Sequence, residues 1–142
     1  METLYKYVVA GHAFGVLLPD AFPAQKYLRP YEPFAASSDV DTLFTLKLST
    51  VESLKDTAPG KVRECFNDEA PYFWIFEGKE RYNFGFSYRK SSPDCLHKPS
   101  EDFRENVLYV PSANAERLME FAVSNAMMLL YTFCTSPYDT LM

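Results

Sequence analysis

Cys95 and His97 are the residues whose types and spacing come closest to a catalytic pair. They alternate in an extended segment, so their side chains could share a face. An imidazole next to a thiol can act as the general base that activates the thiol as a nucleophile. Catalysis would also need hydrogen-bond contact and a third group that orients the base. Because Ser91 to Glu101 is polar and contains two prolines, we expect a solvated loop here, and a small enzyme using Cys95 and His97 is only an alternative.

No other set of residues indicates a reaction. Paired carboxylates occur in three polar stretches that we expect to be ordinary surface: Asp39/Asp41, Asp68-Glu69 and Glu101-Asp102. General acid–base work needs a carboxyl whose site raises its pKa. Gly60-Lys61 and Gly78-Lys79 lack the Ser/Thr and helix that follow a P-loop, so they indicate turns. We therefore expect no catalytic residue, no metal site and no cofactor in this chain.

The composition indicates one soluble globular domain over residues 1–142. The net charge is -5 and the basic residues are scattered, which argues against nucleic acid or an anionic membrane as partner. The three cysteines are widely spaced and contain no C-x-x-C, which favours reduced thiols and a cytoplasmic location. No secretory signal is visible at the N-terminus. Glu120 interrupts the most apolar stretch, 118–134, which we expect to be a buried helix and not a membrane span.

The order of apolar patterns predicts an α+β fold, a largely antiparallel β-sheet with one long C-terminal helix packed on it. A helix should end near Thr135, because Pro137 disfavours helical geometry at the residue before it. Closely spaced prolines between Pro19 and Pro33 exclude a long helix or central strand there. Period-two or apolar runs predict strands at 4–9, 14–18, 42–49, 61–66 (an edge), 72–76, 82–88 (a hairpin with the preceding run) and 107–110.

The predicted C-terminal helix is apolar almost all round, because no charged residue lies between Phe121 and Tyr138. Such a helix needs partners on more than one side. The sheet can cover one side, and we expect a further domain to cover another, so that the chain is the N-terminal part of a longer protein. Two apolar strips are expected: Leu118, Phe121, Ala122, Leu129, Thr132 and Phe133 on one, and Val123, Met127 and Leu130 on the other.

The two ends of the chain resemble a known family. The segments concerned are Tyr7–Phe14, Asn114–Met119, Met127–Phe133 and Asp139–Met142. They are similar to the N-terminal domain and linker helix of HPr kinase/phosphorylase-like and phosphoenolpyruvate carboxykinase-like proteins. The resemblance implies that a P-loop kinase-like core follows Met142. It assigns no catalytic residue to this chain, because the family's catalytic residues would lie in that core.

Three functions are compatible with these observations. The leading prediction is a non-catalytic accessory domain for docking, regulation or substrate recognition, whose partner is the C-terminal kinase-like domain of the same chain, with homo-oligomers left open. The second is a ligand-binding module with an aromatic pocket between the sheet and the proline-rich loop, and the third is the Cys95/His97 enzyme. The candidate ligand or interface residues are Tyr27, Tyr31, Trp74, Tyr82, Met127 and Leu130.

Overall fold

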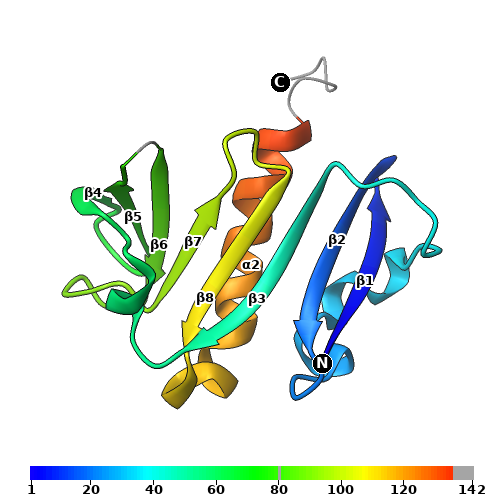
Figure 1. Cartoon of the computed structure of the whole chain (residues 1–142), viewed down its shortest axis with the longest axis horizontal. Helices are drawn as coiled ribbons and strands as arrows, with labels where there is room; N and C mark the ends of the chain where they lie inside the picture. The colour runs from blue at the N-terminus through cyan, green and yellow to red at the C-terminus, as the bar shows by residue number, and fades with distance from the viewer. Residues whose placement is uncertain (80, 136–142) are drawn as a thin grey trace.

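The protein is an α+β fold in which one eight-stranded sheet carries a long helix on one face (Figure 1). The computed structural model describes residues 1–79 and 81–135. In chain order the elements are β1 (Glu2–Val9), β2 (His12–Pro19), α1 (Ala24–Tyr27), η1 (Arg29–Phe34), β3 (Phe44–Val51), η2 (Leu54–Thr57), β4 (Lys61–Phe66), β5 (Tyr72–Glu77), β6 (Tyr82–Ser87), β7 (Cys95–Pro99), β8 (Glu105–Pro111), η3 (Ser112–Asn114) and α2 (Ala115–Thr135).

The sheet order is β1-β2-β3-β8-β7-β6-β5-β4, and neighbouring strands are antiparallel except at β2/β3 and β3/β8. Both exceptions involve β3, because the chain crosses over through α1 and η1 to reach it and later returns on its other side as β8. The predicted, largely antiparallel α+β fold is thus confirmed. β4 is an end strand as expected, and its bulge between Val62 and Glu64 interrupts the regular edge.

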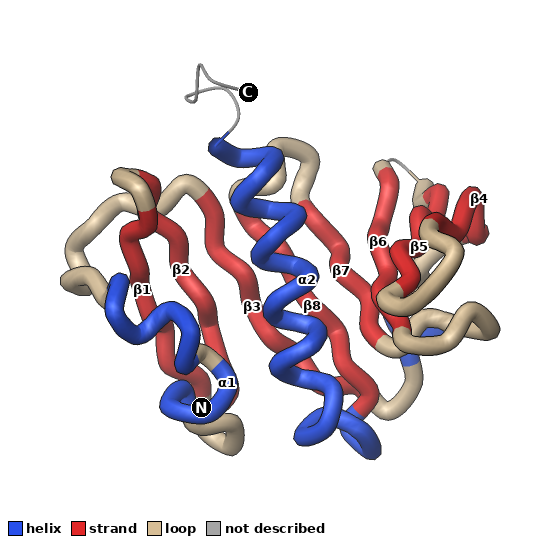
Figure 2. The backbone as a smooth tube through the Cα atoms, turned by 180° about the vertical axis from the view of Figure 1, so that it is seen from behind, coloured by secondary structure: helices blue, strands red, loops and turns tan. Residues whose placement is uncertain are grey.

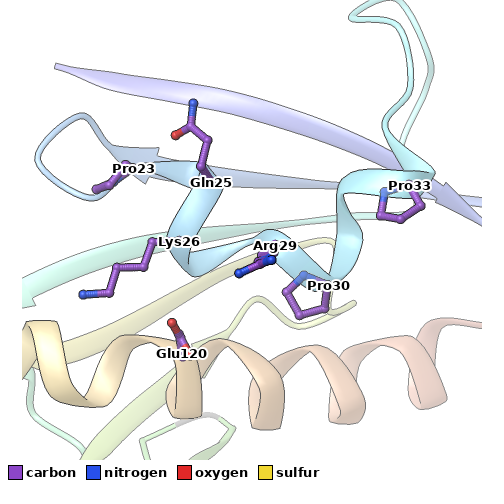
Figure 3. A pocket seen from close by; sticks show the side chains of 7 residues that line it. All are labelled: Pro23, Gln25, Lys26, Arg29, Pro30, Pro33 and Glu120. Carbon is purple, nitrogen blue, oxygen red and sulfur yellow. The ribbon is translucent and has the colours of Figure 1, made fainter.

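The main core lies between the sheet and α2, which crosses β3, β8 and β7 (Figure 2). The shorter α1 and η1 cover β1 and β2 on the same face, and Figure 3 shows Pro23 and Pro30 on this segment beside α2. Tyr27 and Leu28 are buried there. The prolines thus restrict the segment to short helices, as predicted.

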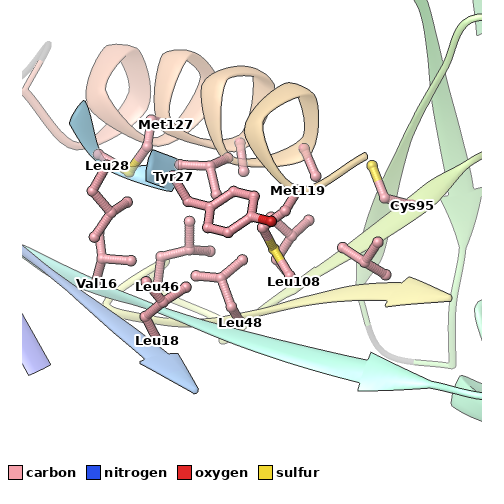
Figure 4. Packing of buried hydrophobic residues seen from close by; sticks show 14 of the residues in the cluster. Val16, Leu18, Tyr27, Leu28, Leu46, Leu48, Cys95, Leu108, Met119 and Met127 are labelled. Carbon is pink, nitrogen blue, oxygen red and sulfur yellow. The ribbon is translucent and has the colours of Figure 1, made fainter. Parts of the chain in front are cut away.

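Alternating residues of the strands fill this core. Val16, Leu46 and Leu108 point toward α2, where Met119 and Met127 face them (Figure 4). All five are buried, and each such side chain contributes about 1.5–3 kcal/mol by leaving water. The period-two pattern of the sequence therefore identified the buried face of β2 and β3.

The opposite face of the sheet carries a smaller cluster of Trp74, Phe76 and Leu96. The Trp74 Nε1–H donates to Ser87 Oγ at 2.8 Å. Trp74 belongs to β5. This strand is covered on both faces, since Phe73 packs against the main core, but it lies next to the edge strand β4.

The segment expected to be a solvated loop contains strand β7, so this prediction is wrong. Cys95, Leu96 and His97 are all buried, and β7 pairs with β6 and β8. The polar composition concealed the strand because its polar side chain, His97, finds its partner on β8. That pairing is a tertiary contact, which local pattern does not reveal.

Helix α2 extends to Thr135, as predicted. The first expected strip is split in the structure: Leu118 and Ala122 are buried, whereas Phe121 and Leu129 are half-buried and Phe133 is 55% exposed. The residues buried on α2 are Ala115, Leu118, Met119, Ala122, Val123, Ala126, Met127 and Leu130. One face of α2 is therefore fully used by the domain's own core.

Candidate docking surface on the C-terminal helix

The Cys95 thiol is held in its unreactive form. It is fully buried, and its Sγ lies 3.7 Å from the Phe86 carbonyl oxygen. Burial raises the pKa of the Cys95 thiol well above its usual value. Because the thiolate is the nucleophile, a neutral thiol at this depth is a structural residue.

The His97 ring is also neutral and buried. Its Nε2 lies 2.8 Å from Asn106 Oδ1, and the Asn106 amide donates to the carbonyls of Phe103 and Thr45 at 2.8 and 3.3 Å. These two bonds leave Oδ1 as the acceptor, so the proton of the imidazole resides on Nε2. Burial lowers the pKa of His97 to about 4, against a smaller opposite effect of the Asn106 bond. The expectation that Cys95 and His97 are solvated loop residues is therefore wrong, and no described contact joins them.

The paired carboxylates lie on the surface. All six residues of the three pairs are exposed. The Ser37 hydroxyl lowers the pKa of Asp39, and the Arg104 backbone N–H lowers that of Asp102. A general acid needs a shift in the other direction. Among residues 1–79 and 81–135, no group of three His, Cys, Asp or Glu side chains could hold a metal ion.

The four candidate aromatic residues do not converge on one site. Tyr27 is buried and Tyr31 contacts Tyr7, with ring centroids 5.8 Å apart, on the α2 side of the sheet. Trp74 belongs to the cluster on the opposite face. Tyr82 is 45% exposed, and the Arg63 guanidinium lies 5.5 Å from its ring centroid. The structure thus separates the residues that an aromatic pocket would have to share.

A cavity of about 800 Å³ does adjoin the proline-rich segment, but its walls are different residues. Figure 3 shows them: Pro23, Gln25, Lys26, Arg29, Pro30 and Pro33, with Glu120 of α2 on the other side. Lys26 and Arg29 are both exposed. The cavity therefore has a basic and an acidic wall and no stacking platform.

The outward face of α2 changes character halfway along the helix. A residue at every fourth position is exposed, in the order Glu116, Glu120, Ser124, Met128 and Thr132. The first two are charged and the last three are not. Met128 is 69% exposed, the largest exposed fraction of any apolar side chain on α2. We call Ser124, Met128 and Thr132 the helix ridge.

A groove lies on each side of the helix ridge, and Met128 lines both. The hairpin-side groove has a volume of about 300 Å³ and is lined by Val9, Phe14, Tyr31, Ser124, Met127, Met128 and Tyr131. The β5-side groove has a volume of about 420 Å³ and is lined by Asn67, Pro71, Tyr72, Phe73, Phe86, Asn125, Met128, Leu129, Thr132 and Phe133. Among the described residues that line the two grooves, none is charged.

A row of aromatic rings fixes the β5-side groove against the end of α2. Phe66, Phe73, Phe84, Phe103 and Phe133 stack in sequence, with centroid separations of 6.1, 5.7, 6.3 and 5.5 Å. Each pair adds about 0.5–1.5 kcal/mol beyond the area that it buries. The groove is therefore preformed and needs little ordering to receive a partner.

Two candidate interface residues, Met127 and Leu130, are only 3% and 0% exposed, because they face the sheet. Sequence reasoning missed Met128, the exposed neighbour of Met127. The signal was present as the four-residue spacing from Glu116 and Glu120, which marks the outward face of the helix.

Comparison with protein families, with curated proteins and with solved structures found no match for this chain. The structure defines a class: an α+β domain with one mixed sheet, one long helix and an uncharged ridge on that helix. The similarity to HPr kinase-like proteins is a sequence resemblance and stays a prediction. Within the described ranges, no helix combines the length and apolar character needed to cross a membrane.

Proposed function

We propose that this protein is a non-catalytic accessory domain that docks onto a larger polypeptide through the helix ridge. The observation that carries the proposal is the exposed Met128 between two grooves, on the half of α2 that has no charge. Interface cores are depleted of charged residues and enriched in methionine and aromatic residues. Surface helices that face only water carry charge on their outward positions.

The ridge has the parts of an interface in the expected arrangement. Met128 and Phe133 are exposed apolar side chains, and Asn125 and Thr132 supply polar groups beside them. Glu120, at the end of the ridge, begins the charged half of the helix. A central apolar contact with a polar rim is typical of stable complexes, which bury about 800 Å² on each partner.

The partner proposed is a kinase-like core of the HPr kinase or phosphoenolpyruvate carboxykinase type, in the same chain. This identity is supported by the resemblance of the two ends of the sequence. It requires that the reading frame after Met142 encode a P-loop of the form G-x-x-x-x-G-K-[ST], which the core would use to bind nucleotide.

Two measurements test the proposal. Isothermal titration of the present domain with Mg-ATP should give no heat of binding, and a micromolar affinity would show that the domain is not merely accessory. Titration with the separately expressed downstream segment should give binding that Met128→Glu weakens at least about tenfold, because a buried charge costs more than 1.4 kcal/mol. Val62→Glu is the matched control, since Val62 is 50% exposed on β4. Equal effects of the two variants, or a downstream frame without a P-loop, would contradict the proposal.

A further inference from the structure

Strand β1 is one end of the sheet, so none of the other described strands pairs with its outer edge. Its hairpin with β2 fixes which residues face that edge. Ala10 and Gly11 form the two-residue turn with φ of 51° and 82°, and Val9 pairs with His12. In such a turn the residues that close it exchange both backbone hydrogen bonds, and along antiparallel strands these bonded pairs alternate with unbonded ones.

The alternation directs the backbone groups of Glu2, Leu4 and Lys6 away from β2, toward the open edge. One observation confirms this direction independently, because the Ala36 N–H donates to the Lys6 carbonyl at 2.9 Å. Tyr7 and Ala35 form an antiparallel bridge at the same place. A short extended piece of this chain therefore already occupies half of the edge.

The chain leaves the edge just beyond this bridge. The Lys6 ammonium group donates to the carbonyls of Ser38 and Val40, both at 2.7 Å, and so holds the following loop to one side. For the edge groups of Glu2 and Leu4, no hydrogen bond appears among the described residues outside the strand ladders. An open edge of this kind is a template for another extended chain.

The open part of the edge meets a cavity at Leu4, and this cavity continues along β1 to Tyr7, beside the bridge. Its volume is about 420 Å³, within the range of sites that bind ligands. Four consecutive residues of β1 line it, as expected for a groove that follows a strand edge, and α1 and η1 form the opposite wall. The lining is Leu4, Tyr5, Lys6, Tyr7, Ala24, Gln25, Leu28, Glu32, Ala35, Ala36 and Ser38.

We propose that this groove binds an extended peptide, which pairs antiparallel with β1 in line with Ala35–Ala36. The peptide would exchange backbone hydrogen bonds with Leu4 and place alternate apolar side chains against Tyr5 and Leu28. About three residues of the peptide can pair, because the open part of the edge runs from Glu2 to Leu4 and antiparallel strands pair residue for residue. The bridge at Tyr7 blocks longer pairing, so a full strand of a second copy fits the groove less well than a short peptide.

The site is separate from the helix ridge, and its test does not depend on the partner proposed there. The probe is the capped hexapeptide acetyl-(Thr-Val)₃-amide, added at millimolar concentration to the isotopically labelled domain. Amide hydrogen exchange should slow about tenfold at Leu4, the factor that corresponds to one net hydrogen bond. The Tyr5 amide, which points to β2, should show no change.

Leu4→Pro removes only the N–H that faces the groove, which an edge strand tolerates. Because Leu4→Pro has no amide at this position, binding to both variants is followed by the peptide-induced shift of the Leu28 amide resonance, from the opposite wall of the groove. Leu4→Pro should lose this shift, whereas Leu4→Ala, which keeps the N–H, should retain it. If Leu4→Pro does not fold, the exchange of the Leu4 amide in the wild type still tests the proposal. Unchanged exchange at Leu4 in the wild type would overturn the proposal. So would protection that rises with protein concentration in the absence of peptide, because that result assigns the edge to a second copy.

Discussion

Lowering the pH from 7 to 5 should destabilise the folded domain by about 2 kcal/mol through His97 alone. The cause is geometric. The Nε2–H of His97 is committed to Asn106, and Nδ1 is buried with no hydrogen-bond partner among the described residues. Protonation would place a new N–H and a positive charge at a buried site with no acceptor among the described residues.

The magnitude follows from the difference between the folded and unfolded pKa. The pKa of His97 falls from 6.5 to about 4 on folding. Above pH 6.5 the ring is neutral in both states, so it contributes its full stabilisation. Below pH 6.5 only the unfolded state takes up the proton, and stability is lost until the folded state also protonates near pH 4. At pH 5 the loss covers about 1.5 units at about 1.36 kcal/mol each.

The assay is denaturant unfolding at pH 7 and pH 5, followed by the fluorescence of Trp74, which is buried and is the single tryptophan. His97→Gln keeps a donor for Asn106 but cannot titrate, so its free energy of unfolding should vary much less between these two pH values. His12→Gln, which removes the other histidine, should keep the wild-type difference. The reasoning is refuted if the wild type is equally stable at both pH values, or if His97→Gln keeps the whole pH dependence.

Two further predictions concern the interior and the turns. Cys95 should resist a thiol reagent such as dithiobis(nitrobenzoate) in the folded protein and react only after denaturation. The reason is that it is fully buried and that the pKa of its thiol is raised. Labelling of Cys95 at the rate of an unfolded control would contradict its structural role. Gly11→Ala should cost about 1–2 kcal/mol, since φ is +82° but nothing lies within 4 Å of the new Cβ. Gly60→Ala should cost more in the same denaturant titration, because at φ +97° the new Cβ would lie 2.5 Å from a backbone oxygen; equal costs would show that this oxygen moves freely.

The sequence was most informative for elements whose structure follows from the pattern of apolar and polar residues within that one element. Phe44, Leu46 and Leu48 alternate with polar residues, and all three are buried. That α2 reaches Thr135 was also predictable, because the apolar run of the sequence is long and the first proline after that run is Pro137. The buried face of a strand and the extent of a helix depend mainly on backbone geometry and on which side chains avoid water, and both can be read from a single segment.

The sequence was least informative where a distant contact decides the outcome. His97 can be buried because Asn106, nine residues away, accepts a hydrogen bond from its Nε2–H. Met127 and Met128 are adjacent and chemically identical, yet one is 3% and the other 69% exposed. About 100° of helix rotation separates them, and only the direction from which the sheet approaches determines which of them is buried.

The division of α2 into a charged and an uncharged half corresponds to what lies beside each half. Glu120 faces the cavity wall that carries Lys26 and Arg29 (Figure 3). Glu120, in the charged half of the outward face, therefore lies across this cavity from the domain's own basic groups. No described charged residue lines the grooves beside Met128. An exposed apolar side chain at that position gains free energy only when another surface covers it, which is why we propose that docking uses the second half of the helix.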